Sequence, residues 1–178
     1  MNERAPRTSV QLPKLIKQKE KEYYMSYTTG EFEVEAGVPT SVLTGSIQAE
    51  AFEPGEAPTR IFDIRDDVVV TCQWSLTGSL ARMICGTWEC DVYLESIGEG
   101  AEFEFEGNNG NPIPLDPGGN GQYSTNITIP AGTIQPAPGE TDIPYKMVVT
   151  VTYKDPAGHP GPIAGFVELP LVQFYLDA

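Results

Sequence analysis

Alternation of apolar and polar residues, with a period of two, runs through most of this chain and constrains its fold more than any other feature. Successive side chains of a β-strand point to opposite faces, so this period is typical of strands that are buried on one side. Segments rich in Gly, Pro, Asn and Asp, which favour turns, separate the alternating runs. The runs predict strands at 31–35, 42–52, 59–63, 67–77, 86–96, 101–106, 122–129, 145–153 and 165–176.

The strand pattern also predicts the fold class. No segment after residue 24 has a convincing helical period, and a chain of 178 residues is long enough to bury a core of its own. Alternating strands joined by turns pack as two antiparallel sheets that share one core. We therefore predict an all-β protein, an antiparallel β-sandwich of roughly seven to nine strands with immunoglobulin-like or jelly-roll architecture.

Residues 1–24 differ from the rest of the chain in charge. Residues 1–22 carry a net charge of +3 and the remainder carries −17, within a total of −14. We predict a basic N-terminal extension over 1–24, disordered or a short helix, followed by the sandwich domain over 25–178. Two readings of the extension stay open. It is either an arm that docks on the acidic body of a neighbouring subunit, or a disordered extension or sequence upstream of a true start at Met25.

The charge and the apolar runs also limit the classes of partner. An acidic body repels phosphate backbones, which argues against nucleic-acid binding. No apolar run approaches the roughly 20 residues that cross a bilayer, so a membrane location is not expected. The first residues lack the apolar core of a secretory signal, and this absence predicts a cytoplasmic protein. The expected partner is another protein or further copies of the same chain.

The stretch from 68 to 96 contains all the cysteine and tryptophan residues of the chain. In both predicted strands of this stretch the even-numbered positions are apolar, and an antiparallel hairpin would bring the two apolar faces together. That register aligns four pairs: Trp74 with Trp88, Cys72 with Cys90, Val70 with Val92, and Val68 with Leu94.

The cysteines allow three interpretations. We expect Cys72 and Cys90 to be buried, reduced thiols packed beside the tryptophans. A disulfide is the first alternative, although directly opposite residues of one sheet are farther apart than a relaxed disulfide prefers. A metal site is the second, and it lacks support because the sequence has no CxxC pair and a single histidine.

No constellation of residues indicates catalysis. His159 lies in a Gly- and Pro-rich turn, and the chain has no GxSxG motif. Glu102, Glu104 and Glu106 fall on one strand face at a spacing that permits two-carboxylate hydrolysis, but any solvated strand face has this spacing. We therefore predict a protein that is not an enzyme and needs no cofactor.

Calcium binding is the alternative function. Calcium prefers several oxygen ligands that converge from loops. Asp63, Asp66 and Asp67 precede one predicted strand, and Asp116 lies in a long Asn- and Gly-rich loop. If the two loops met at one end of the sandwich, they would form a calcium-dependent site for a carbohydrate or a membrane surface.

The C-terminal run is apolar on both faces, and its phase changes around Pro170, which predicts an edge strand or a bulge. Such a strand lies in the core or at a subunit contact. We predict a structural module that acts in protein interaction or assembly, with Val172, Phe174 and Leu176 as candidate interface residues. Lys14 and Lys17 of the basic extension would engage an acidic neighbour.

Overall fold

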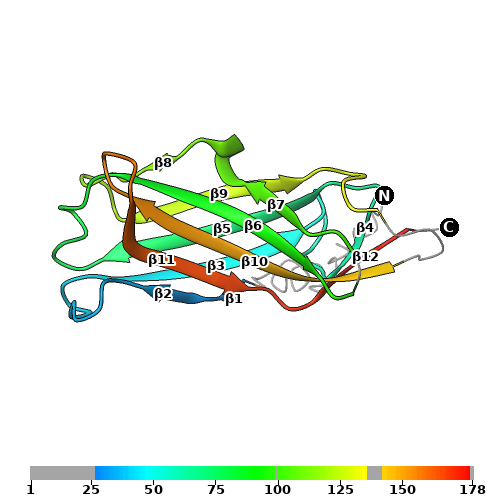
Figure 1. The fold of residues 1–178 in the computed structure, drawn as a ribbon, viewed down its shortest axis with the longest axis horizontal. Helices are drawn as coiled ribbons and strands as arrows, with labels where there is room; N and C mark the ends of the chain where they lie inside the picture. The colour runs from blue at the N-terminus through cyan, green and yellow to red at the C-terminus, as the bar shows by residue number, and fades with distance from the viewer. Residues whose placement is uncertain (1–26, 99, 136–141, 177–178) are drawn as a thin grey trace, which may run out of the picture.

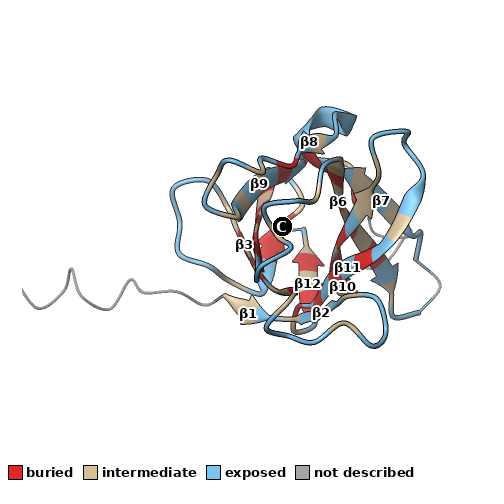
Figure 2. Ribbon diagram, turned by 90° about the vertical axis from the view of Figure 1, so that its left-hand side faces the viewer, coloured by how far each residue is buried: buried red, intermediate tan, exposed pale blue. Residues whose placement is uncertain are grey.

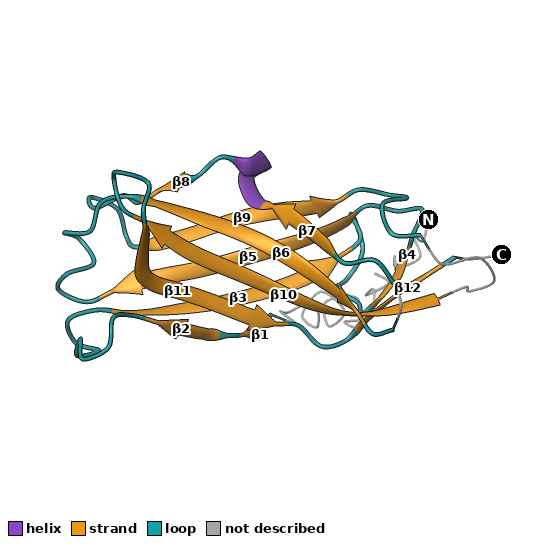
Figure 3. Cartoon of the chain, viewed as in Figure 1, coloured by secondary structure: helices purple, strands orange, loops and turns teal. Residues whose placement is uncertain are grey.

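The structure, a computed structural model, describes residues 27–98, 100–135 and 142–176. The chain folds as a β-sandwich in which two sheets pack face to face (Figures 1 and 3). This architecture confirms the all-β fold class predicted from the alternation. The predicted extension, residues 1–24, lies outside the described residues together with Lys14 and Lys17.

Sheet A has four strands, all antiparallel to their neighbours. Its order from edge to edge is β1 (Thr28–Thr29), β3 (Thr44–Phe52), β5 (Val68–Thr77) and β9 (Gln122–Ile129).

Sheet B contains the other eight strands of the described residues. They are β2 (Glu31–Glu33), β4 (Ile61–Asp63), β6 (Thr87–Ser96), β7 (Phe103–Glu106), β8 (Ile113–Pro114), β10 (Asp142–Lys154), β11 (Pro160–Glu168) and β12 (Val172–Tyr175). Both β11 and β12 pair with the same side of β10, and both β7 and β8 pair with β6. Because several short strands lie end to end, sheet B is only five strands wide.

The core lies between the two sheets, as the red segments of Figure 2 show. On β5 and β6 the even-numbered side chains predicted to face inward are buried, and Val70, Cys72, Trp88, Val92 and Leu94 are at most 3% exposed. On β10 the odd-numbered positions face inward instead. The alternation therefore assigned the buried faces of β5 and β6 correctly.

The predicted hairpin of β5 with β6 is wrong. β5 pairs with β3 and β9 in sheet A, whereas β6 pairs with β7, β8 and β10 in sheet B. The connection from 78 to 86 is longer than the two to five residues of a usual hairpin loop, and it crosses the roughly 10 Å between the sheets. Alternation shows which face of a strand is buried. It does not show whether two strands with apolar faces are neighbours in one sheet or oppose each other across the core.

Two of the pairs predicted for the hairpin, Trp74 with Trp88 and Cys72 with Cys90, nevertheless interact across the core. The rings of Trp74 and Trp88 are in edge contact, with centroids 6.3 Å apart. Phe32 of β2 also packs against Trp88, at 6.2 Å. Cys72 and Cys90 thus belong to different sheets, which corrects the expectation that they share one.

Candidate assembly surface

Exposed apolar side chains gather at one end of the sandwich, around β4 and β12. Seven large apolar side chains are exposed in the described part of the chain, and four of them lie at this end. We call these four residues the end patch: Ile61 (57% exposed), Ile97 (51%), Leu171 (58%) and Leu176 (43%). Apolar side chains that cluster on a surface, unlike single ones, indicate a contact with a partner.

Strand pairing explains how residues far apart in sequence meet in the end patch. Ile61 lies opposite Gln173, which lies opposite Pro144. The N–H of Ile97 donates a hydrogen bond to the carbonyl of Pro144 at 2.9 Å. Neighbouring strands are about 4.8 Å apart, so this row places Ile61 and Ile97 roughly 14 Å from each other. Leu171 precedes Gln173, a member of the row, by two residues.

A bulge at Pro170 turns Leu171 toward solvent. On β10, Val148 and Tyr145 are three residues apart. The residues paired with them, Glu168 and Val172, are four residues apart. The extra residue breaks the alternation, as bulges do. Before and after the bulge the inward side chains are buried: Val167, Leu169, Val172 and Phe174. This result confirms the phase change predicted at Pro170.

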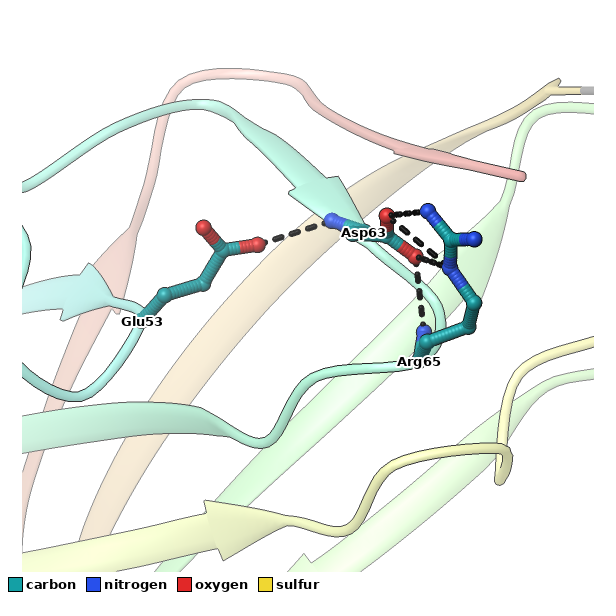
Figure 4. Close-up of polar contacts among 3 residues, drawn as sticks. All are labelled: Glu53, Asp63 and Arg65. Carbon is teal, nitrogen blue, oxygen red and sulfur yellow. Dashed lines mark hydrogen bonds and ion pairs between the residues drawn. The ribbon is translucent and has the colours of Figure 1, made fainter. Parts of the chain in front are cut away.

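Polar contacts hold β4 beside the end patch (Figure 4). The N–H of Asp63 donates to a carboxylate oxygen of Glu53 at 2.8 Å. The guanidinium of Arg65 donates to both carboxylate oxygens of Asp63, and its backbone N–H donates to Oδ1 at 2.9 Å. These hydrogen bonds from Arg65 hold the pKa of the Asp63 carboxyl below its usual value.

A small groove lies at the edge of sheet A, beside the segments that precede β4 and β12. Its cavity measures about 90 Å³ and is lined by Thr28, Glu50 and Ala51 on one side and by Arg60, Pro170 and Val172 on the other. β1 covers only two residues of β3, Gln48 and Ala49. Within the described residues, the segment 50–52 of β3 therefore has a strand neighbour on one side only, and an edge of this kind can accept another strand.

The structure divides the predicted interface residues between core and surface. Val172 and Phe174 are each 2% exposed, and the Phe174 ring packs on Phe62 and Tyr145. They are core residues in this chain, because the bulge turns both of them inward. Leu176 is exposed in the end patch. Ile61 and Ile97 were not predicted as contact residues, because each lies near the end of a strand and its outward phase was the only signal in the sequence.

The predicted calcium ligands do not meet. Asp67 directly precedes β5, whereas Asp116 lines a cavity with Leu76 and Gly121 at the other end of that strand. By strand rise the two ends are roughly 30 Å apart. Among the described residues, no three His, Cys, Asp or Glu side chains gather closely enough to hold a metal ion.

The four aspartates instead make local contacts. Asp63 binds Arg65, and the N–H of Asp66 donates to the carbonyl of Asp63. Asp67 accepts a hydrogen bond from the N–H of Ala131 at 2.8 Å. Asp116 accepts one from the N–H of Gly118 at 3.0 Å within its own loop. The geometry thus gives the calcium alternative no support.

The other candidates from the sequence lie on exposed turns and strand faces. His159 is 77% exposed, and its Nδ1 lies 3.5 Å from the carboxylate of Asp155. Glu104 and Glu106 face outward on β7. They line a polar cavity of about 390 Å³ with Glu89 and Asp91. Burial, and then the charges of neighbouring glutamates with Glu104 first, raise the pKa of Asp91.

Comparison with known proteins identifies no family for this chain. No protein-family model matches the chain, and no curated protein matches it. One solved structure with a similar fold is AggA, the major subunit of aggregative adherence fimbriae type I from Escherichia coli. The match has a TM-score of 0.39 and 8% sequence identity, and it covers 76% of this chain and 95% of that one. At this level of similarity the match supports no argument about function.

The cytoplasmic location predicted from the sequence is contradicted by this comparison. The similar structure is the major subunit of aggregative adherence fimbriae. The cytoplasmic prediction is therefore wrong by this finding and is not carried further. Among the described residues, no helix has the length and apolar character needed to span a membrane.

Proposed function

We propose that this chain is a non-enzymatic assembly module that binds a second copy of itself through the end patch. The observation that carries the proposal is that Ile61, Ile97, Leu171 and Leu176, all exposed, lie on segments at one end of the sandwich. Association would remove these exposed side chains from water, which is favourable by roughly 25 cal/mol for each Å² of apolar surface buried. Polar and charged residues such as Arg60 and Asp142 border the patch, as in the rim of a protein interface.

Charge favours a second copy as the partner. Residues 1–22 are basic, whereas the remainder of the chain is strongly acidic. Each copy therefore carries both an acidic body and a basic segment that complements the body of another copy. Lys14 and Lys17 would add an electrostatic attraction to the apolar contact, and such attractions raise association rates more than they raise affinity.

Size-exclusion chromatography with light scattering tests this proposal on the full-length chain. We expect the wild type to form an oligomer at a concentration of tens of micromolar, and Leu171→Glu to make it monomeric, because a charge would be buried in the contact. Met83→Glu is the matched control, since Met83 is 73% exposed but lies in the loop that connects β5 to β6, away from the end patch. Circular dichroism would confirm that both variants fold.

The possible outcomes distinguish the contact surfaces. A monomeric wild type at these concentrations would overturn the proposal. Dissociation by Met83→Glu with no effect of Leu171→Glu would place the contact at the opposite end of the sandwich and would also contradict it. The double variant Lys14→Glu and Lys17→Glu reports on the basic segment separately, and we expect it to slow association and leave the apolar contact in place.

A further inference from the structure

Two buried cysteines face each other across the core, although they lie on different sheets. Cys72 is on β5 of sheet A and is 0% exposed, and Cys90 is on β6 of sheet B and is 3% exposed. Both are free thiols in the structure. The remaining cysteine, Cys85, is exposed in the connection between these strands.

The contacts around the pair show that the two side chains meet. Trp74 is two residues from Cys72 on β5, and Trp88 is two residues from Cys90 on β6. The rings of these two tryptophans are in contact, with centroids 6.3 Å apart. This contact fixes how β5 and β6 are aligned across the core and sets Cys72 opposite Cys90. A hydrogen bond between the two thiols, together with burial, raises the pKa of Cys90.

The residues beside the two cysteines are small. A disulfide brings two sulfur atoms to about 2.05 Å and needs Cα atoms within about 7 Å. Within sheet A, Cys72 lies beside Ala49. Gly107, in the turn after β7, lies against the backbone of Cys90, where a Cβ would be 2.3 Å from the carbonyl oxygen. A covalent link therefore requires β5 and β6 to approach locally at this pair, where no bulky side chain stands beside either cysteine in these contacts.

We propose that Cys72 and Cys90 form a disulfide that joins the two sheets when the chain folds in the presence of a small-molecule disulfide. In the first step the thiolate of one cysteine attacks a sulfur of oxidised glutathione, forms a mixed disulfide and releases one glutathione thiolate. In the second step the thiolate of the other cysteine attacks the cysteine sulfur of the mixed disulfide and releases the second glutathione thiolate. The two cysteines lose two electrons, the glutathione disulfide gains them, and the protons of the cysteines end on the released thiols.

The bond forms during folding and not in the finished core. The thiolate is the attacking species, and a raised pKa together with burial leaves little thiolate accessible in the native protein. Once formed, the disulfide closes the loop from 72 to 90 and restricts the unfolded chain. For a loop of this length in a protein of this size, we expect the melting temperature to rise by roughly 6 to 12 °C.

The experiment refolds the full-length Cys85→Ser variant from denaturant in two buffers. Removing Cys85, which is exposed, prevents competing disulfides. One buffer contains reduced and oxidised glutathione and the other contains a phosphine reductant. We expect the oxidised sample to weigh two hydrogen atoms less, to show no free thiol in denaturant, to yield a peptide linked from Cys72 to Cys90, and to melt higher than the reduced sample.

The control is the same variant with Cys72→Ala, which cannot form the bond and should melt at the same temperature in both buffers. If this control fails to fold, the comparison of the two buffers for Cys85→Ser alone still decides the question. Two free thiols after refolding with glutathione would overturn the proposal. A disulfide that forms but lowers the melting temperature would also overturn it, because the bond would then be incompatible with the native packing. Neither result depends on the proposed self-association.

Discussion

Phe174 and Leu176 are two residues apart and would share one face of a continuing strand, yet their surroundings differ. Phe174 is 2% exposed and contacts two aromatic rings, whereas Leu176 follows the end of β12 and is 43% exposed. We predict that Phe174→Ala lowers the free energy of unfolding by about 3 to 5 kcal/mol, as for other buried Phe side chains. Leu176→Ala should change it by less than about 0.5 kcal/mol.

Urea denaturation followed by tryptophan fluorescence would measure both variants. The exposed residue serves as the control for the buried one, because both lose a large apolar side chain in the same short segment. Equal losses of stability in the two variants would contradict the placement of Phe174 in the core. A loss of self-association in Leu176→Ala at unchanged stability would agree with its place in the end patch.

Asp91 is a carboxylate whose surroundings oppose its charge. Its pKa is raised by burial and by nearby glutamates, with Glu104 contributing most among them. A carboxyl whose pKa is higher in the folded than in the unfolded state destabilises the fold at pH values above both. This penalty is lost as the pH falls through the folded pKa. We predict that Asp91→Asn raises stability at pH 7 by up to about 1 kcal/mol, and that the gain disappears in acid.

Thermal melts of the wild type and of Asp91→Asn between pH 7 and pH 4 would test this. Glu95→Gln is a suitable control, because Glu95 is exposed on the same strand and has no part in the acidic cavity. A stabilisation by Asp91→Asn that stayed constant down to pH 4 would show that its cause is not the titration of Asp91.

At the scale of the elements, the sequence predicted the strands more accurately than their partners. Each of the nine predicted runs overlaps a strand, and the predicted run 122–129 matches β9 at both ends. The last predicted run, 165–176, covers parts of two strands, β11 and β12. The two-residue strands β1 and β8 were not predicted, since two residues are too few to show alternation. The hairpin of β5 with β6 was wrong because a strand in a sandwich has apolar neighbours both beside it and across the core.

The candidate site was less predictable than the strands for the same reason. The C-terminal run was recognised as a possible contact, and Leu176 lies in the end patch. Ile61 reaches the patch only because β4 pairs in parallel with β12, and more than a hundred residues separate them in sequence. No local pattern encodes such a pairing, and the two-sided apolar character of the C-terminal run came from a bulge and not from two buried faces.

The strand order predicts a gradient of local stability. From Val148 to Thr152, β10 is paired with β11 on one side and with β6 on the other. β9 is paired only with β5 in the described residues. We expect the amides of this β10 segment to exchange with solvent at the rate of global unfolding, and about half of the β9 amides to exchange much faster because they point away from β5. Hydrogen exchange followed by NMR or mass spectrometry measures this, and equal protection of the two strands would contradict the assigned edge.

At the scale of the whole molecule, two electrostatic effects oppose each other in any self-association. The acidic bodies of two copies repel, whereas the basic segment of each copy attracts the body of the other. Both effects act between exposed charges, so salt weakens both, and the Debye length falls from about 10 Å at 0.1 M to about 3 Å at 1 M. The apolar contact of the end patch does not weaken with salt.

The response to salt therefore identifies the dominant contact. If the end patch drives association and the acidic bodies oppose it, raising sodium chloride from 0.05 to 0.5 M should lower the dissociation constant severalfold, since roughly 1 kcal/mol of repulsion would be screened. Sedimentation equilibrium of the wild type would measure this change.

The double variant Lys14→Glu and Lys17→Glu lacks part of the attraction, so its association should respond more strongly to salt than that of the wild type. Association that weakens with salt in the wild type and is absent in the double variant would assign the contact to the basic segment, and the end patch would then not be the main contact.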